Sequence, residues 1–236
     1  SDLFLKEKPD EVYNFSAQSS VGSSFDFPIE TQQSISLITL NILEACKKTN
    51  FIGSIFFSGS SEMYGETLSA AKTDSEINPQ NPYAIAKVES YFLVKLYRES
   101  YGLRVVTGIL FPHESPLRST KFVIHKIISA AANSLKDVNY RIKLGNLDIE
   151  RDWGWAEEYM SAIHLMTNTK TLKDQIICTG KPTKLVDFID KTFKLLDLNW
   201  KDHIKSDKSL FREKDIIRSY GDPSQIYNDL NWKAER

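Results

Sequence analysis

The stretch Phe56-Phe57-Ser58-Gly59-Ser60-Ser61-Glu62-Met63-Tyr64-Gly65 decides how this chain folds. Its apolar start, together with Ile55, predicts a buried strand of a parallel sheet over residues 54–58. If the chain is still extended where it turns polar, Ser60 and Glu62 point to the same side, because side chains alternate along a strand. Open α/β sheets bind their ligands at the carboxyl ends of their strands. The stretch therefore predicts a hydroxyl and a carboxylate side by side in a binding site.

The segment Asn81-Pro82-Tyr83-Ala84-Ile85-Ala86-Lys87 predicts the start of a helix. Tyr83 and Lys87 are one turn apart and share a helix face. A nearby ammonium favours a phenolate, so we expect Lys87 to lower the pKa of Tyr83 and to let it accept a proton from a hydroxyl group. The same spacing recurs at Tyr91 and Lys95, which we interpret as surface and packing residues because no polar loop precedes them.

Strand and helix patterns alternate along the rest of the chain. We expect a segment at 199–221 that is irregular and charged. Strands are expected at 11–15, 54–58, 103–111, 140–144 and 175–179, and helices at 33–48, 83–101, 122–135, 156–167, 185–196 and 223–230. This alternation predicts an α/β fold with a doubly wound parallel sheet.

Composition bounds the class of protein. The 236 residues are 41% hydrophobic with a formal net charge of −1, which suits one α/β domain with a small appended lobe and gives no support for nucleic-acid or membrane binding. No apolar run approaches the ~18–20 residues of a membrane span, and the N-terminal residues do not resemble a signal peptide. Cys46 and Cys178 lie in apolar segments and predict reduced thiols of a cytoplasmic protein. The four histidines are scattered, so we expect no metal site.

Several motifs, in order, resemble the GDP-mannose 4,6-dehydratase family of the extended short-chain dehydrogenase/reductase superfamily. They are Gly59-Ser60-Ser61-Glu62-Met63-Tyr64-Gly65, the Tyr83/Lys87 pair, His113-Glu114-Ser115-Pro116, Leu144-Gly145-Asn146-Leu147-Asp148 and Arg151-Asp152-Trp153-Gly154. The resemblance runs from about Val12 to Trp232. It implies an NAD(P)-binding Rossmann-type sheet with a small C-terminal substrate-binding lobe. It also implies conversion of GDP-mannose to GDP-4-keto-6-deoxymannose with bound NADP, NAD not being excluded.

The resemblance implies four catalytic residues. Tyr83 is the base at the sugar C4 hydroxyl, and Lys87 lowers its pKa and holds the nicotinamide ribose. Ser60, where the family has threonine, keeps the hydroxyl that bonds O4. Glu62 takes the C5 proton and protonates the leaving C6 hydroxyl, a step that elimination needs and simple oxidation does not.

The resemblance also implies binding residues and a division of the chain. Arginine suits a diphosphate because its fork binds oxygens in pairs. Cofactor contacts are expected from Ser16, Ala17, Gln18, Ser19, Lys87, His113 and Arg118, and nucleotide-sugar contacts from Glu62, Lys126, Arg151, Arg212 and Asp215. Residues 1–112 and 174–197 are expected to form the dinucleotide-binding part, and residues 113–173 and 198–236 the nucleotide-sugar-binding part.

Besides Ser60, four positions depart from the family pattern. Pro112 replaces an asparagine, Glu30 a tyrosine, His125 an arginine, and Asp215 a glutamate. These departures leave open a 4,6-dehydratase of another GDP-sugar, such as a heptose. A reductase or epimerase on the same scaffold is a second alternative, against which Glu62 argues, and a non-catalytic binding protein is a third.

No glycine-rich turn follows the first predicted strand, although a dinucleotide fold needs one to seat pyrophosphate on a helix N-terminus. We therefore expect two to three strand–helix units to be missing ahead of residue 1, and residues 1–236 alone not to bind NADP tightly. In the superfamily, helices equivalent to 33–48 and 83–101 pair across a two-fold axis. The resemblance thus implies a homodimer or homotetramer.

Overall fold

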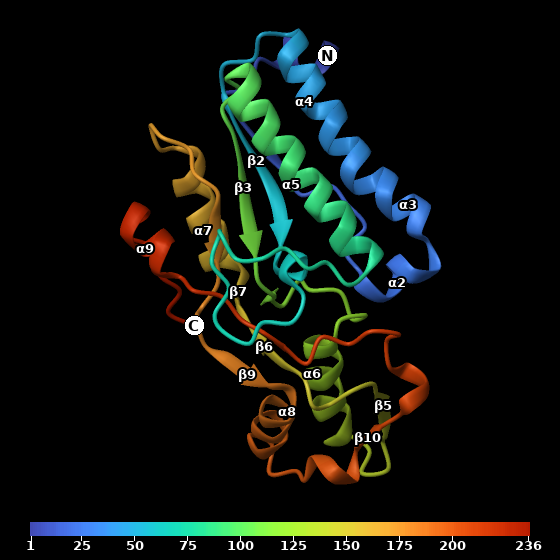
Figure 1. Cartoon of the computed structure of the whole chain (residues 1–236). Coiled ribbons are helices and arrows are strands. Elements are labelled where there is room, and N and C mark those ends of the chain that lie inside the picture. Colours follow the sequence, from blue (N-terminus) through green and yellow to red (C-terminus); the bar gives the residue numbers. More distant parts are fainter.

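The computed structural model describes residues 1–236, and its central feature is a four-stranded parallel sheet (Figure 1). The strand order is β1 (Glu11–Asn14), β2 (Ser54–Ser60), β3 (Val105–Leu110) and β8 (Gln175–Ile177). β3 is buried along its whole length and β2 along nearly all of it, because helices cover both faces of the sheet. The predicted parallel α/β sheet is confirmed, with each expected strand of it within a few residues of its place.

One face of the sheet is covered by two helical segments that run side by side in the same direction, opposite to the strands (Figure 1). The first runs through α2 (Val21–Asp26), α3 (Pro28–Gln32), a π-helical turn (Gln33–Leu37) and α4 (Ile38–Lys48), so it begins well before the predicted residue 33. The second is α5 (Pro82–Tyr101). A short α1 (Asp2–Glu7) precedes β1. No helix of the structure is both long enough and apolar enough to cross a membrane.

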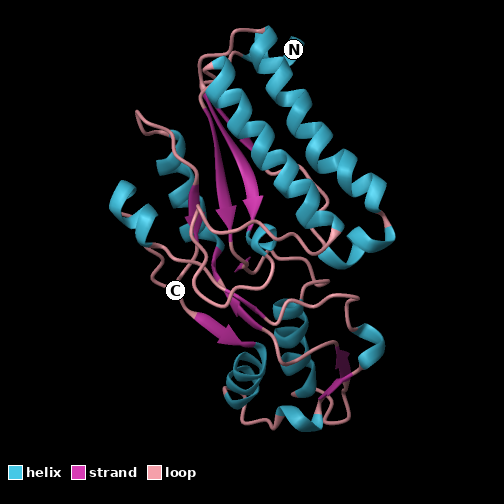
Figure 2. Cartoon of the chain, in the orientation of Figure 1, coloured by secondary structure: helices cyan, strands magenta, loops and turns pink.

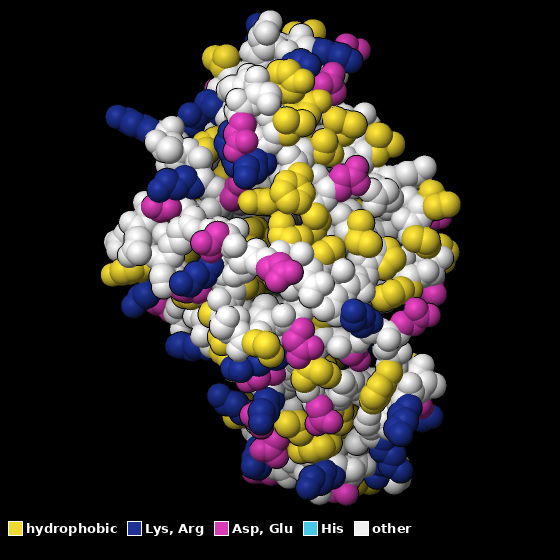
Figure 3. Space-filling model, in the orientation of Figure 1, with side chains coloured by type: hydrophobic (Ala, Val, Ile, Leu, Met, Phe, Trp, Pro, Cys, Tyr) yellow, Lys and Arg dark blue, Asp and Glu magenta, His cyan; other side chains and the backbone are white.

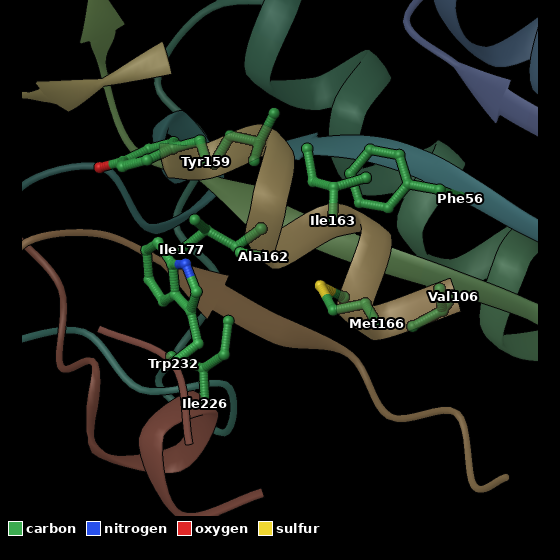
Figure 4. Packing of buried hydrophobic residues seen from close by; sticks show 10 residues of the cluster. Phe56, Val106, Tyr159, Ala162, Ile163, Met166, Ile177, Ile226 and Trp232 are labelled. Atoms are coloured by element: carbon green, nitrogen blue, oxygen red, sulfur yellow. The ribbon is translucent and has the colours of Figure 1, made fainter. Parts of the chain in front are cut away.

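The other face is covered by α7 (Ala156–Thr167) and α9 (Ser224–Leu230), as Figure 4 shows from close by. The sheet contributes Phe56, Val106 and Ile177 to this core. The helices and the C-terminal segment contribute Tyr159, Ala162, Ile163, Met166, Ile226 and Trp232. The chain therefore returns to the sheet at its C-terminal end, after building a separate lobe.

That lobe, which lies below the main sheet in Figure 2, has its own apolar core. It contains α6 (Val123–Ser134), α8 (Leu185–Lys194) and the strand pair β5 (Ile142–Leu144) and β10 (Ile204–Ser206). Between lobe and sheet lie two further small sheets, β11 (Arg218–Ser219)–β6 (Glu150–Asp152)–β9 (Pro182–Lys184) and β4 (His113–Glu114)–β7 (Gly154–Trp155). Single 3₁₀ turns occupy Ser61–Tyr64, Trp200–Asp202 and Lys208–Leu210.

This packing differs in two places from the division of the chain expected from the sequence. α7 and α9 pack on the main sheet, although 156–167 and 223–230 were expected in the second part. α8 packs against α6 in the lobe, although 185–196 was expected in the first part. The helices themselves are correctly predicted. An apolar stripe shows that a helix is buried, but not which element buries it.

Asp152 ties the small sheet of the middle region to the main sheet. It is fully buried, and its carboxylate accepts hydrogen bonds from the backbone N–H of Thr179 and of Gly180, both at 2.8 Å, and from the Thr179 hydroxyl at 2.6 Å. We expect Asp152→Ala to lower the free energy of unfolding by about 3–5 kcal/mol, since it leaves buried donors unpaired. Denaturant titration measures the loss, and the exposed Asp148→Ala is the control. A loss below about 1 kcal/mol would contradict this role.

Candidate active site

Ser60 and Glu62 lie where β2 ends, but not on one extended strand. The chain enters a 3₁₀ turn immediately after Ser60, whose hydroxyl caps the turn by accepting from the Glu62 N–H at 3.3 Å. The expectation of an extended backbone at Glu62 is therefore wrong. The turn still keeps both side chains close enough to act on the pKa of Tyr83, which Ser60 lowers and the Glu62 charge raises.

Tyr83 stands in the first turn of α5, where the local sequence places it. Asn81 caps the helix, its Oδ1 accepting from the Ala84 N–H at 2.8 Å, and Pro82 occupies the first helical position. Burial raises the pKa of Tyr83 to about 12. The hydrogen bond with Ser60 lowers this pKa and the charge of Glu62 raises it, both by less than burial does.

Lys87 does not act on Tyr83 as expected. Its Nζ lies 5.7 Å from the centroid of the Tyr83 ring and donates instead to the carbonyl of Ser58 at 2.7 Å and to the Ser58 hydroxyl at 3.2 Å. The residue is 5% exposed, and burial lowers the pKa of Lys87 to about 8. The expectation that Lys87 depresses the pKa of Tyr83 is wrong for this structure, because burial of the phenol outweighs an ammonium held away from it.

A small cavity adjoins Lys87 and collects polar groups from four elements. Asn14 at the end of β1, Ser16 after it, Ser58 of β2 and Ser90 of α5 all line it. This set supplies hydroxyl, amide and ammonium groups, but the cavity of about 10 Å³ has room for no more than about one water molecule. Lys87 and Ser16 are the predicted cofactor residues among its lining.

The rest of the predicted segment 16–19 lies beside this cavity. The Ser16 N–H donates to Asn14 Oδ1 at 3.1 Å. Gln18 donates from Nε2 to the carbonyl of Ser20 at 2.8 Å and to the Thr31 hydroxyl at 3.1 Å, which joins the segment to α3. Ala17 is half-buried and Ser19 exposed. The segment is thus held against the helical layer.

His113 and Arg118 follow β3, the strand next to β2. His113 donates from Nδ1 to the Phe111 carbonyl at 2.9 Å, and burial lowers the pKa of its ring. Arg118 lies with its Nε 3.6 Å from Glu114 Oε2 and its guanidinium over the Phe122 ring. The Arg118 charge lowers the pKa of Tyr83, by less than burial raises it. Burial raises the pKa of Glu114, which the sequence reasoning did not single out.

The predicted sugar-nucleotide residues divide into a buried and an exposed group. Arg151 is 6% exposed, and its guanidinium donates to the carbonyls of Glu150 at 2.9 Å, Ile216 at 2.6 Å and Ile217 at 3.1 Å. It therefore holds the segment that carries Asp215. Burial lowers the pKa of Arg151, and the charge of Glu62 opposes this.

The other members of that group lie at the surface. Arg212 is exposed, with its Nε 3.9 Å from Asp215 Oδ1. Lys126 is exposed on α6, in the lobe. The charges of Glu62, Arg212 and Asp215 all act on the pKa of Arg151, whereas no contact joins Lys126 to this group.

Two functional contacts were missed from the sequence. Asn81 donates from Nδ2 to Glu62 Oε2 at 2.9 Å, although the sequence marked it only as a helix entry. Ser58 holds Lys87, and its alternation with Ser60 along the strand was the available signal.

The loop after Glu62 is pinned to the C-terminal segment. The Thr67 N–H donates to the Arg218 carbonyl, and the Ala71 N–H to the Tyr220 carbonyl, both at 3.0 Å. The Asp222 N–H returns a bond to the Ala71 carbonyl at 2.9 Å. This contact brings two segments about 150 residues apart in sequence to one edge of the site.

Comparison with known proteins agrees with the motifs. The family model described as GDP-mannose 4,6 dehydratase matches residues 1–236. GDP-mannose 4,6 dehydratase 1 of Arabidopsis thaliana is 37% identical over 232 residues, which cover 97% of this chain and 64% of that protein. GDP-mannose 4,6-dehydratase of Vibrio cholerae is 34% identical over 267 residues, covering 99% of this chain and 70% of that protein. The chain spans less than two thirds of the length of the plant relative.

Solved structures share the fold. RMD from Pseudomonas aeruginosa, complexed with NADPH, has a TM-score of 0.85 at 25% identity, covering 96% of this chain and 76% of that one. DesIV, a dTDP-glucose 4,6-dehydratase from Streptomyces venezuelae, has a TM-score of 0.88 at 19% identity, covering 100% of this chain and 72% of that one. These likenesses confirm the predicted Rossmann-type fold. With the family match over the whole chain, they show that this chain belongs to the GDP-mannose 4,6-dehydratase family.

Proposed function

We propose that this chain carries the catalytic machinery of a GDP-mannose 4,6-dehydratase, a lyase that forms GDP-4-keto-6-deoxymannose. The observation that carries the proposal is the position of Glu62, an acid/base group beside the Ser60–Tyr83 pair and hydrogen-bonded to Asn81. Oxidation of an alcohol needs one proton acceptor, whereas elimination of water needs a second group that moves a proton. Ser60 and Tyr83 supply the first and Glu62 the second.

The first proton transfer uses Ser60 and Tyr83. The sugar C4 hydroxyl would bond to both side chains, and Tyr83 would accept its proton as C4 is oxidised. A bound NADP, or NAD, would take hydride from C4 and return it to C6. Because burial raises the pKa of Tyr83 to about 12, its phenol is neutral at physiological pH in this structure, and it would have to lose its proton before it could accept the one from the C4 hydroxyl.

The second proton transfer uses Glu62. The C4 ketone makes the C5–H bond acidic, so the Glu62 carboxylate can take that proton while the electrons move toward the ketone. The resulting acid then protonates the C6 hydroxyl, which leaves as water, and a C5=C6 double bond forms. Glu62 is then a carboxylate again; it would take a new proton from solvent and deliver it to C5 as hydride returns to C6, which completes the reduction and restores the carboxylate.

Binding roles are proposed for the remaining predicted residues. Ser16, Ala17, Gln18, Ser19, Lys87, His113 and Arg118 would hold the cofactor; Lys126, Arg151, Arg212 and Asp215 would serve the GDP-sugar. The cationic guanidinium groups at the site suit phosphate oxygens. The main-sheet part of the chain would then bind the dinucleotide and the lobe the nucleotide-sugar.

A product assay tests the proposed function. The natural protein is incubated with GDP-mannose and NADP in deuterated water, and the product is analysed by mass spectrometry and NMR. We expect a 4-keto-6-deoxy sugar nucleotide with one deuterium at C5, because the proton carried by Glu62 exchanges with solvent. A 4-keto or epimerised sugar that retains its C6 hydroxyl would instead indicate a reductase or an epimerase.

We also propose that the protein self-associates through α4 and α5 into a homodimer or homotetramer. Apolar side chains gather over these helices in the space-filling view (Figure 3). Exposed members on this surface are Leu37, Ile85, Phe92 and Leu96, each about half exposed. A contiguous exposed apolar surface marks an interaction site.

Phe92→Glu is expected to convert the assembly to monomers, because it places a charge in the centre of an apolar interface. Light scattering at micromolar concentration measures the mass. Leu195→Glu, on an exposed side chain beyond α8 in the lobe, is the control and should leave the mass unchanged. A monomeric wild-type protein at that concentration would contradict the proposal.

A cytoplasmic location is proposed on the two cysteines. Cys46 and Cys178 are free thiols, and both are buried. Unpaired buried thiols are typical of proteins kept in a reducing compartment.

A further inference from the structure

Asn81 joins the helix cap of α5 to the acid/base residue of the site. Its side chain is 4% exposed and makes two hydrogen bonds in opposite roles. Oδ1 accepts from the Ala84 N–H at 2.8 Å, and Nδ2 donates to Glu62 Oε2 at 2.9 Å.

The cap fixes which way the amide faces. A backbone N–H can meet only an acceptor, so the amide oxygen must point toward Ala84. The amide nitrogen is then left facing Glu62, where it can only donate. Asn81 therefore holds a donor against Oε2 of Glu62 in every state of the site in which the helix cap persists.

A donor held against one carboxyl oxygen decides where the proton of the neutral acid resides. Oε2 would serve as the accepting carbonyl oxygen, and the acid proton would sit on Oε1. In addition, Glu62 faces the N-terminus of the 20-residue α5 across this bond, where the helix dipole favours the anion. The Glu62 carboxylate is thus oriented before any substrate binds. Its two oxygens then differ, because Oε2 accepts the Asn81 hydrogen bond and Oε1 is left to carry the proton.

We propose that Asn81 is a positioning residue that makes Oε1 of Glu62 the oxygen that carries the proton between C5 and the C6 hydroxyl. The inference rests on the proposed function, because it assigns an atom to the elimination step. During elimination the C5–H bond breaks as the Oε1–H bond forms, and the Oε1–H bond breaks as the C6 oxygen leaves as water. Asn81 itself touches no reacting atom.

The test replaces Asn81 in two ways that both keep a helix-capping acceptor. Asn81→Asp is isosteric but places an acceptor against Oε2, whereas Asn81→Ser is too short to reach Glu62. Single turnovers of the natural protein with GDP-mannose are analysed for two products: sugar oxidised at C4 only, and the 4-keto-6-deoxy sugar. We expect Asn81→Asp to slow elimination by about 10²-fold, the size expected for a misplaced catalytic group, and Asn81→Ser to slow it less.

The ratio of the two products separates positioning from folding. Oxidation at C4 and the substrate KM should change less than twofold in both variants, so that sugar oxidised only at C4 accumulates. A merely structural role would reduce both steps together. Equal elimination by wild type, Asn81→Asp and Asn81→Ser would overturn the inference, as would a loss confined to KM.

A second readout needs no catalysis. In the ¹⁵N NMR spectrum of the protein, the Asn81 side-chain amide should lose its hydrogen-bonded shift in Glu62→Ala, which removes the acceptor, while the Ala84 amide keeps its position. An Asn81 amide shift that does not change when Glu62 is replaced by alanine would also overturn the inference. If the wild type forms no 4-keto-6-deoxy sugar, the proposed function fails and takes the inference with it; if it does, and Asn81→Asp is unaffected, only the inference fails.

Discussion

Replacing Glu62 by glutamine is expected to stop elimination of water while oxidation at C4 continues. The rate of 4-keto-6-deoxy product formation should fall by about 10²–10⁴-fold, the contribution typical of a general acid/base. The amide has nearly the same size as the carboxylate and can still accept the Asn81 hydrogen bond through its oxygen. It cannot take the C5 proton or pass one to the C6 hydroxyl. Sugar nucleotide oxidised only at C4 should therefore accumulate in a single turnover.

The measurement is product analysis by mass spectrometry, together with substrate affinity by calorimetry. Glu76→Gln is the matched control, because Glu76 is an exposed glutamate in the loop that follows the active-site turn. It should leave both products unchanged. If Glu62→Gln weakens substrate binding but leaves the proportion of the two products as in wild type, Glu62 is a binding residue and not the proton shuttle.

Lys87→Met is expected to abolish turnover and at the same time to stabilise the fold. Burial lowers the pKa of Lys87 from its ordinary 10.5 to about 8, so the charged form is unfavourable in the native state. The native protein then binds fewer protons than the unfolded chain between pH 8 and 10.5. The buried ammonium therefore lowers the free energy of unfolding of the wild type. This loss is complete below pH 8 and disappears as the pH rises toward 10.5. A shift of this size corresponds to about 3 kcal/mol.

At pH 7 the variant should therefore unfold at a higher denaturant concentration than wild type. Its free energy of unfolding should be larger by up to about 3 kcal/mol, and this difference should shrink as the pH approaches 10. The loss of the two bonds to Ser58 reduces the gain. Lys95→Met is the control, since Lys95 is exposed two turns further along α5 and should change stability by less than about 0.5 kcal/mol at either pH. A variant less stable than wild type at pH 7 would show that the buried ammonium is held favourably.

The sequence by itself determined the elements on which the site is built. The strand that carries Ser60 and the helix that carries Tyr83 lie where the local pattern predicts them, and α5 begins at the cap Asn81 and ends at Gly102, which adopts φ 66°. These features follow from interactions over a few residues: apolar runs, a capping amide, a proline in the first turn and a glycine at the end. The motifs also placed the chain in its family, which the whole-chain match confirms.

Only the tertiary structure decided what those elements contact. α8 packs in the lobe, and α7 and α9 pack on the main sheet. The apolar stripe of a helix shows that it is buried but not against which element. Strands of two or three residues, such as β10 and β11, have no period to detect. The raised pKa of Tyr83 and the lowered pKa of Lys87 both arise from burial by residues distant in the sequence. The bond from Asn81 to Glu62 spans 19 positions and exists because β2 and α5 pack side by side, which no local pattern encodes.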